Sequence, residues 1–231
     1  MIRITTLLAL PMIAAVALSY AGLINIFISN INRSFPLAVG FIIYLLAHFS
    51  MKRKKIISYL YVLSHEFSHA IFGFLSGNRI KKISVKPNKG YVIFSAKSNV
   101  ITAISPYIFP LYNAIFFLFY IFVNKGIEGK YFGIFLFFQG FLISFHILNT
   151  IEVISLNQKD FKETGGRISS IVLITLFNLI IFATIILLST PSGVSGLKIF
   201  FTESFKYYVI LIKKIFLLFK SLIFIVKDFT K

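Results

Sequence analysis

The sequence contains no cysteine, and only 7 of its 231 residues are acidic. Without cysteine the chain has no disulfide, no thiolate nucleophile and no sulfur ligand for a metal ion. Any metal would therefore be held by histidine, aspartate or glutamate. Charged residues of both signs make up 13% of the chain, whereas soluble domains carry about 25%. This scarcity argues against an ordinary soluble enzyme.

Hydrophobic residues account for 58% of the sequence, and the mean hydropathy is +0.89. A soluble fold of this length cannot bury so many apolar side chains, because much of its surface remains in contact with water. The same composition excludes a disordered chain. We therefore expect an integral, multi-pass membrane protein.

The 24 basic residues give a net charge of +17. In a soluble protein this excess would suggest nucleic-acid binding. Here the basic residues mostly lie between apolar runs, where lysine and arginine set membrane topology and meet anionic headgroups. The expected partner is thus the lipid bilayer and not a nucleic acid.

Six apolar segments are long enough, or nearly so, to span a bilayer. The first contains an Ala15-Val-Ala17 stretch that resembles a signal-peptide cleavage site, but its length favours an uncleaved helix. Pro106 and Pro110 predict kinks in the fourth segment. The fold class is therefore an all-α polytopic membrane protein with about six transmembrane helices, predicted at residues 4–28, 35–51, 56–75, 100–123, 131–155 and 168–189.

Two further segments do not follow this pattern. Residues 79–97 alternate apolar and polar side chains around a Pro-Asn-Lys-Gly turn, which predicts a β-hairpin. After a linker at 191–196, Lys206, Lys213, Lys220 and Lys227 recur every seven residues and share one helical face. This tail predicts an amphipathic helix in the membrane interface, with a seventh span as the alternative. We accordingly divide the chain into 1–55 with two helices, a 56–190 core and a 191–231 tail.

The third apolar segment contains the pattern H-E-x-x-H at His65, Glu66 and His69. Residues at i and i+4 lie on one helical face about 6 Å apart along the axis, so both imidazoles can bind one zinc ion. Glu66 would lie beside the metal and take a proton from a zinc-bound water. The alternative is that these polar residues only form hydrogen bonds within a helical bundle and have no chemical function, as we expect for the lone His48. Three ionisable residues in an apolar span favour a functional site.

These residues, followed by the 77–85 segment Gly-Asn-Arg-Ile-Lys-Lys-Ile-Ser-Val, resemble the site-2 protease family of intramembrane zinc metalloproteases, in its compact prokaryotic subgroup. Residues 103–112 and 158–165 also resemble segments of that subgroup, and the likeness covers about residues 56–190. It implies a zinc metalloendopeptidase of a prokaryotic cell membrane, with one Zn2+ per chain. Its substrates would be membrane proteins or peptides cut in or near their transmembrane segments. It also implies that the hairpin adds an extended substrate as a further strand.

A catalytic zinc ion normally has three protein ligands and an open position. In the site-2 protease family the third ligand is an aspartate in an Asn- and Pro-rich stretch that ends in Asp-Gly. This chain departs from that pattern, because no proline follows Asn149 and Asp160 is followed by phenylalanine. We assign Asp160 as the third metal ligand, since it lies in the 158–165 segment. Its alternative role is a loop acid that balances neighbouring lysines.

His146 and Glu152 are the reserve ligands, because they share a helical stripe with Asn149. That stripe would otherwise form hydrogen bonds between helices, although Asn149 is also a candidate to bind substrate. The alternative function is a non-proteolytic membrane metal-binding or transport protein, or an inactive protease homologue that acts as a binding partner. An intact Glu66 and the absence of an internal repeat argue for the enzyme.

Overall fold

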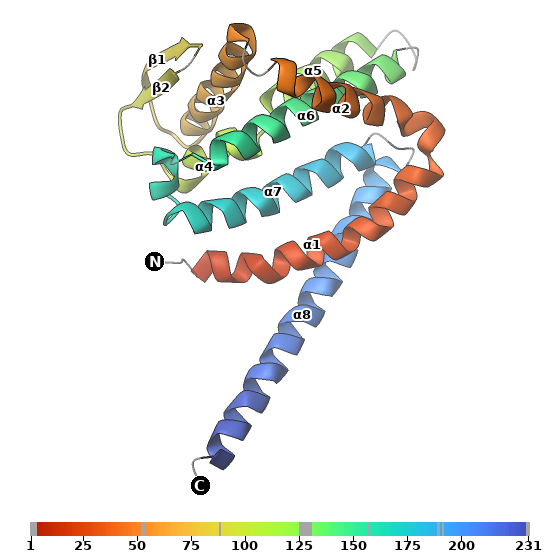
Figure 1. The fold of residues 1–231 in the computed structure, drawn as a ribbon, viewed down its shortest axis with the longest axis vertical. Helices are drawn as coiled ribbons and strands as arrows, with labels where there is room; N and C mark the ends of the chain where they lie inside the picture. The colour runs from red at the N-terminus through yellow and green to blue at the C-terminus, as the bar shows by residue number, and fades with distance from the viewer. Residues whose placement is uncertain are drawn as a thin grey trace. The chain divides into compact units, whose positions relative to one another are not determined.

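The computed structural model describes residues 4–51, 54–87, 89–124, 131–156, 158–188, 190 and 192–229 (Figure 1). It is almost entirely helical, with one small antiparallel sheet, as the sequence predicts. The elements are α1 (Ile4–Ser29), α2 (Ile31–Met51), α3 (Lys55–Leu75), β1 (Ile80–Lys86), β2 (Lys89–Phe94), α4 (Val100–Ile108), α5 (Leu111–Asn124), α6 (Phe132–Ile154), the 3-10 helix η1 (Lys159–Lys162), α7 (Arg167–Leu188) and α8 (Gly193–Phe229).

Within the described residues, four helices are long and apolar enough to cross a membrane, namely α1, α2, α6 and α7. The count rises to five if the pair α4 and α5 forms one broken span. Helix α3, which carries the H-E-x-x-H pattern, does not meet the same criterion of length and composition. An integral membrane protein is therefore supported, whereas a total of six spans stays a prediction.

The bend expected in residues 100–123 is present, but it is a full break, because the chain forms two helices bent by 72° and not one continuous helix. The break lies at Phe109 and Pro110. Proline lacks a backbone N–H and disfavours helical geometry in the residue before it. Phe109 accordingly takes extended backbone angles, with φ of −103° and ψ of 105°. Pro106, by contrast, lies inside α4.

The chain divides into two compact units. The first comprises Ile31–Ile174, and the second comprises Arg3–Asn30 with Thr175–Lys231. These units differ from the division at residues 55 and 190 in the sequence analysis, which stays a prediction.

In the first unit, α2 and α6 cross with their backbones in close contact. A Cβ atom on Gly40 would lie 1.9 Å from the carbonyl oxygen of Phe137, and one on Gly140 would lie 1.9 Å from that of Leu37. Only glycine fits at either position. The sequence analysis did not identify this reciprocal pair, because the two glycines are far apart in the chain.

The hairpin packs on α3 in the same unit, and its two strands pair as predicted. Gly73 lies against the ring of Phe94, which a Cβ atom would approach to 2.3 Å. Gly77 has a φ of 78° and follows the end of α3. Gly73 therefore allows the hairpin to pack closely on α3, and Gly77 lies just after the end of that helix.

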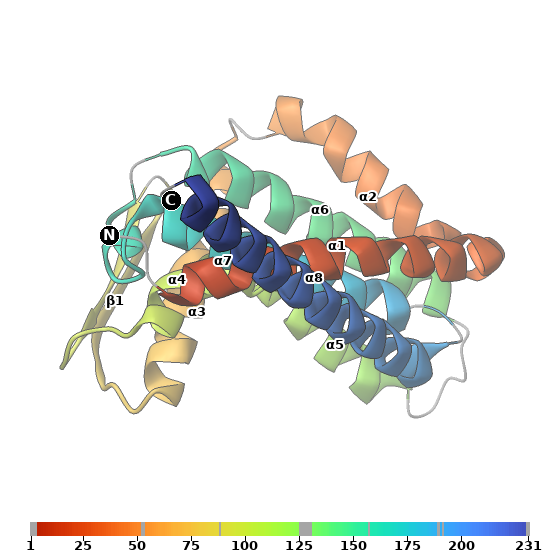
Figure 2. The same ribbon diagram turned by 90° about the horizontal axis from the view of Figure 1, so that it is seen from below.

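In the second unit, α8 packs against α1, where the Ser204 hydroxyl donates to Ser19 Oγ at 3.0 Å. Helix α8 begins at Gly193, so the predicted linker at 191–196 is too long. The helix then continues well beyond α1 in Figure 1, and Figure 2 shows the two helices crossing.

Candidate metal centre and active site

Helix α3 presents both histidines of the H-E-x-x-H pattern on one face. The ring centroids of His65 and His69 lie 4.9 Å apart, so the two imidazoles are neighbours one turn apart. Their side chains are largely buried, at 13% and 12% exposed. The local spacing thus produces the pair of nitrogen donors that it predicts.

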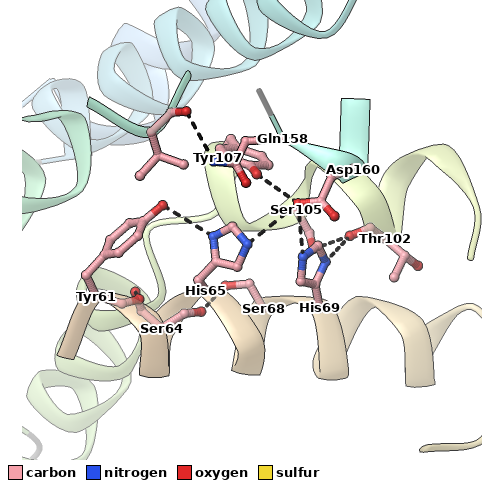
Figure 3. Close-up of polar contacts among 11 residues, drawn as sticks. Tyr61, Ser64, His65, Ser68, His69, Thr102, Ser105, Tyr107, Gln158 and Asp160 are labelled. Carbon is pink, nitrogen blue, oxygen red and sulfur yellow. Dashed lines mark hydrogen bonds and ion pairs between the residues drawn. The ribbon is translucent and has the colours of Figure 1, made fainter. Parts of the chain in front are cut away.

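Asp160 approaches this pair from η1, which lies about ninety residues further along the chain and is separated from α3 by the hairpin and three helices. Its Oδ2 atom lies 3.6 Å from His65 Nε2 and 3.5 Å from His69 Nε2 (Figure 3). Together the three side chains offer ligand atoms that all lie within 4.8 Å of one another. Among the residues described, no other group of three such side chains is found.

The other ring nitrogens are held by hydrogen bonds. His69 Nδ1 lies 2.8 Å from the Thr102 carbonyl oxygen, which can only accept, so this nitrogen carries a proton. His65 Nδ1 lies 3.3 Å from the Tyr61 hydroxyl. Partners of this kind fix the tautomer and orientation of metal-binding histidines. Both Nε2 atoms are thus directed at the Asp160 carboxylate.

Tyr107 of α4 completes the surroundings of Asp160, and the sequence analysis did not single it out. Its hydroxyl donates to Asp160 Oδ2 at 2.8 Å, and its ring meets that of His65 edge-on at 5.2 Å. The side chain is fully buried and also packs on Phe161. Burial alone would raise the pKa of Asp160, but hydrogen bonds with His65, His69 and Tyr107 hold it well below its usual range. A lowered pKa favours the ionised carboxylate, which is the form that binds a metal ion.

Glu66 lies beside this cluster and is only 6% exposed. Strand β2 passes directly over it, since a Cβ atom on Gly90 would lie 2.4 Å from Glu66 Cγ. A cavity of about 590 Å³ opens at this point and is lined by the H-E-x-x-H side chains, by β2 and by Asp160 with its neighbours. The cavity therefore brings together two histidines, three carboxylates and residues of strand β2.

The reserve ligands, His146 and Glu152, lie outside the group formed by His65, His69 and Asp160. Glu152 Oε1 is 3.1 Å from Nε2 of His48, so His48 is not a lone polar residue. Asn149 donates to the Phe145 carbonyl oxygen at 2.7 Å and contacts the Tyr44 hydroxyl at 3.5 Å. The contacts of Glu152 with His48 and of Asn149 with Tyr44 join α6 to α2, which matches the helix–helix bonding considered for this stripe. His146 does not belong to the group of side chains that could hold a metal ion.

The donor set fits a zinc ion. In a tetrahedral site with metal–ligand bonds of about 2.0–2.2 Å, neighbouring ligand atoms are separated by about 3.3–3.6 Å. The measured separations of 3.5 and 3.6 Å between the Asp160 oxygen and the histidine nitrogens fall at that spacing. Three protein donors also leave the fourth position open, as catalytic zinc requires.

Apolar helices of spanning length together with an H-E-x-x-H helix, a third carboxylate and a cavity define the class of membrane metalloproteases. A comparison with known families bears this out, because the model of the peptidase M50B-like family matches residues 35–231. The chain therefore belongs to this family of site-2-protease-type membrane peptidases. The match extends on both sides of the 56–190 region in which the resemblance was expected. No curated protein and no solved structure matches the chain.

Proposed function

We propose that the chain is a zinc-dependent endopeptidase that hydrolyses peptide bonds in or near the transmembrane segments of its substrates. The observation that carries the proposal is the convergence of His65, His69 and Asp160 beside Glu66 in one cavity. Membership of a membrane peptidase family supports the reaction class, and the site supplies candidate residues for each role.

His65, His69 and Asp160 would hold the metal through two nitrogens and one oxygen. When bound, zinc supplies Lewis acidity, which makes a water molecule acidic near neutral pH and polarises a carbonyl group. Thr102 and Tyr107 keep one histidine and the carboxylate in place, so the donor atoms meet at one point before metal binds. Such partners reduce the reorganisation that binding would otherwise require.

Glu66 acts as general base and then as general acid in this proposal. Its carboxylate takes a proton from the attacking water and gives it to the nitrogen of the departing amine. Its low exposure supports the assignment, because a poorly hydrated carboxylate is a stronger base than one in bulk water. Contact with Gly90 limits where the carboxylate can lie.

Strand β2 is the proposed docking edge for the substrate. It pairs with β1 on one side only, in a sheet of two strands among the described residues. Gly90, Tyr91, Val92 and Phe94 of this strand line the cavity. An extended segment could add here as a third strand, which fits a peptidase, because a peptide bond inside a helix has its carbonyl group already engaged.

The proposal also includes α3 as a span, which together with the broken pair α4 and α5 gives six. Ionisable residues inside a membrane are costly and mark functional sites by default. The polar residues of the H-E-x-x-H pattern are the ones that lower the hydropathy of α3. A water-filled cavity at the site would hydrate these groups within the bilayer.

Zinc stoichiometry in detergent-solubilised protein tests the metal site. We expect one zinc per chain in the wild type, loss of zinc in His65→Ala and His69→Ala, and weakened binding in Asp160→Ala. Glu66→Gln should keep zinc and lose proteolysis, because it preserves the shape of the side chain and removes its basicity. Full zinc loading in both histidine variants would refute the site, whereas an active Glu66→Gln variant would refute the role of Glu66.

A further inference from the structure

Residues 213–223 of α8 form an exposed stretch in the second half of this helix. Every residue from Lys213 to Ile223 is exposed, although the first half of the helix contacts α1. The exposed residues include large apolar side chains, among them Phe216, Leu218 and Phe219, which are more than 60% exposed. A helix of this composition cannot present that surface to water.

The exposed segment has two different faces. Lys206, Lys213 and Lys220 are seven residues apart, which corresponds to a drift of only about 20° per repeat around an α-helix. Ile215, Leu218 and Leu222 follow one another at steps of three and four residues and form a stripe on the opposite side. The helix therefore carries a lysine face and an apolar face along the same length.

We propose that residues 213–223 of α8 lie flat on an anionic bilayer surface, with the apolar stripe in the acyl boundary and the lysines at the phosphates. A helix that lies in the plane of the interface keeps all lysines of one face at a single depth. A spanning helix would instead carry Lys213, Lys214 and Lys220 through the hydrocarbon, where each is costly.

The charge of the segment identifies the surface. Residues 204–223 contain four lysines and no acidic residue. Glu203, the acid that precedes this segment, is bonded to Lys206 at 2.7 Å, and no ion pair among the described side chains involves Lys213, Lys214 or Lys220. Basic residues next to apolar surface are attracted to anionic lipid headgroups, so lipid phosphate is the expected counter-ion.

A depth profile of the full-length chain tests this placement, and the absence of native cysteine makes single-cysteine variants free of background labelling. Spin labels would be placed at Leu217 and Ser221 on the lysine face and at Leu218 and Leu222 on the apolar face. The probe is a vesicle of phosphatidylcholine with phosphatidylglycerol. We expect labels on the apolar face about 5–10 Å below the phosphates, and those on the lysine face at the phosphate level.

Other profiles would overturn the placement. In a spanning helix, depth changes steadily with residue number, by about 6 Å over four residues. Packing against a second copy of the chain would produce spin–spin broadening at Leu218 and Leu222. Labels that all contact water would show that the segment leaves the membrane altogether.

The role of charge is tested by the triple variant with Lys213, Lys214 and Lys220 changed to Gln. In the wild type, labels on the lysine face should be less accessible to a water-soluble relaxation agent in phosphatidylglycerol vesicles than in pure phosphatidylcholine. The α8 variant should lose this difference. A matched triple variant of Lys81, Lys82 and Lys86 in the hairpin should retain it. Equal accessibility in the two vesicles for wild type would overturn the anionic preference. These measurements do not depend on proteolysis or on zinc.

Discussion

Replacing Gly90 by alanine tests whether Glu66 must occupy the position in which the hairpin holds it. The new Cβ atom would lie 2.4 Å from Glu66 Cγ, 2.6 Å from its Oε1 and 2.8 Å from its Cδ. Non-bonded carbon atoms prefer about 3.5–4.0 Å, so the Glu66 side chain would have to move by about 1 Å. A displacement of this size at a reacting group can reduce the rate about 10²-fold.

The expected result for Gly90→Ala is therefore a fall of about 10²-fold in kcat, equivalent to about 2.7 kcal/mol of transition-state stabilisation. Zinc content should remain at the wild-type level, because the clash involves Glu66 and not the three proposed ligands. The assay is cleavage of a fluorogenic peptide library in detergent, with zinc measured on the same samples. Gly22→Ala is the matched control, since a Cβ atom there meets nothing within 4 Å.

Wild-type proteolysis by Gly90→Ala would refute the reasoning, because it would show that the base works from another position or is not Glu66. Loss of zinc from this variant would be a different failure. It would mean that the hairpin contact positions the metal-binding histidines as well as the base. Measuring both quantities on one preparation separates these outcomes.

Three further results are expected. Tyr107→Phe removes the hydrogen bond to the Asp160 carboxylate and should weaken zinc affinity about 10–100-fold in a chelator competition. The control is Tyr112→Phe, which loses a hydrogen bond to a main-chain carbonyl and should not change zinc affinity. Gly40→Ala should lower the thermal unfolding midpoint in detergent, because its Cβ atom would lie 1.9 Å from a backbone oxygen of α6. Overpacking of this kind costs about 1–3 kcal/mol or more. An unchanged midpoint would contradict the close crossing of α2 and α6. Removal of zinc with a chelator should abolish proteolysis reversibly, and activity that survives complete removal would contradict a metal-dependent reaction.

Features that depend on local geometry could be predicted from the sequence. The helical period places His65 and His69 on one face wherever the helix lies, and the alternation after Arg79 produces the two strands. Residues 131–155 were expected to form one helix, and α6 runs from Phe132 to Ile154. In each case neighbouring residues along the chain determine the structure.

Features that depend on contacts between distant residues could not be predicted in this way. The close approach of Gly40 to Gly140 requires knowledge of which helices pair, and glycine is frequent in membrane helices whether or not it lies at a helix crossing. Tyr107 resembles any aromatic residue in a membrane helix until Asp160 is brought beside it. The same holds for Glu152, whose contact with His48 separates it from the metal-binding group.

The order of elements along the chain explains why the hairpin can control the proposed base. It follows α3 directly, so β2 returns along the helix that carries Glu66, and two contacts fix its distance from that helix. At Gly73 a side chain would meet Phe94, and at Gly90 it would meet Glu66. Strand β2 can therefore lie against α3 only where both positions lack a Cβ atom. Because the same strand lines the cavity, the wall that a substrate would contact and the carboxylate that would take the proton are held by one packing arrangement.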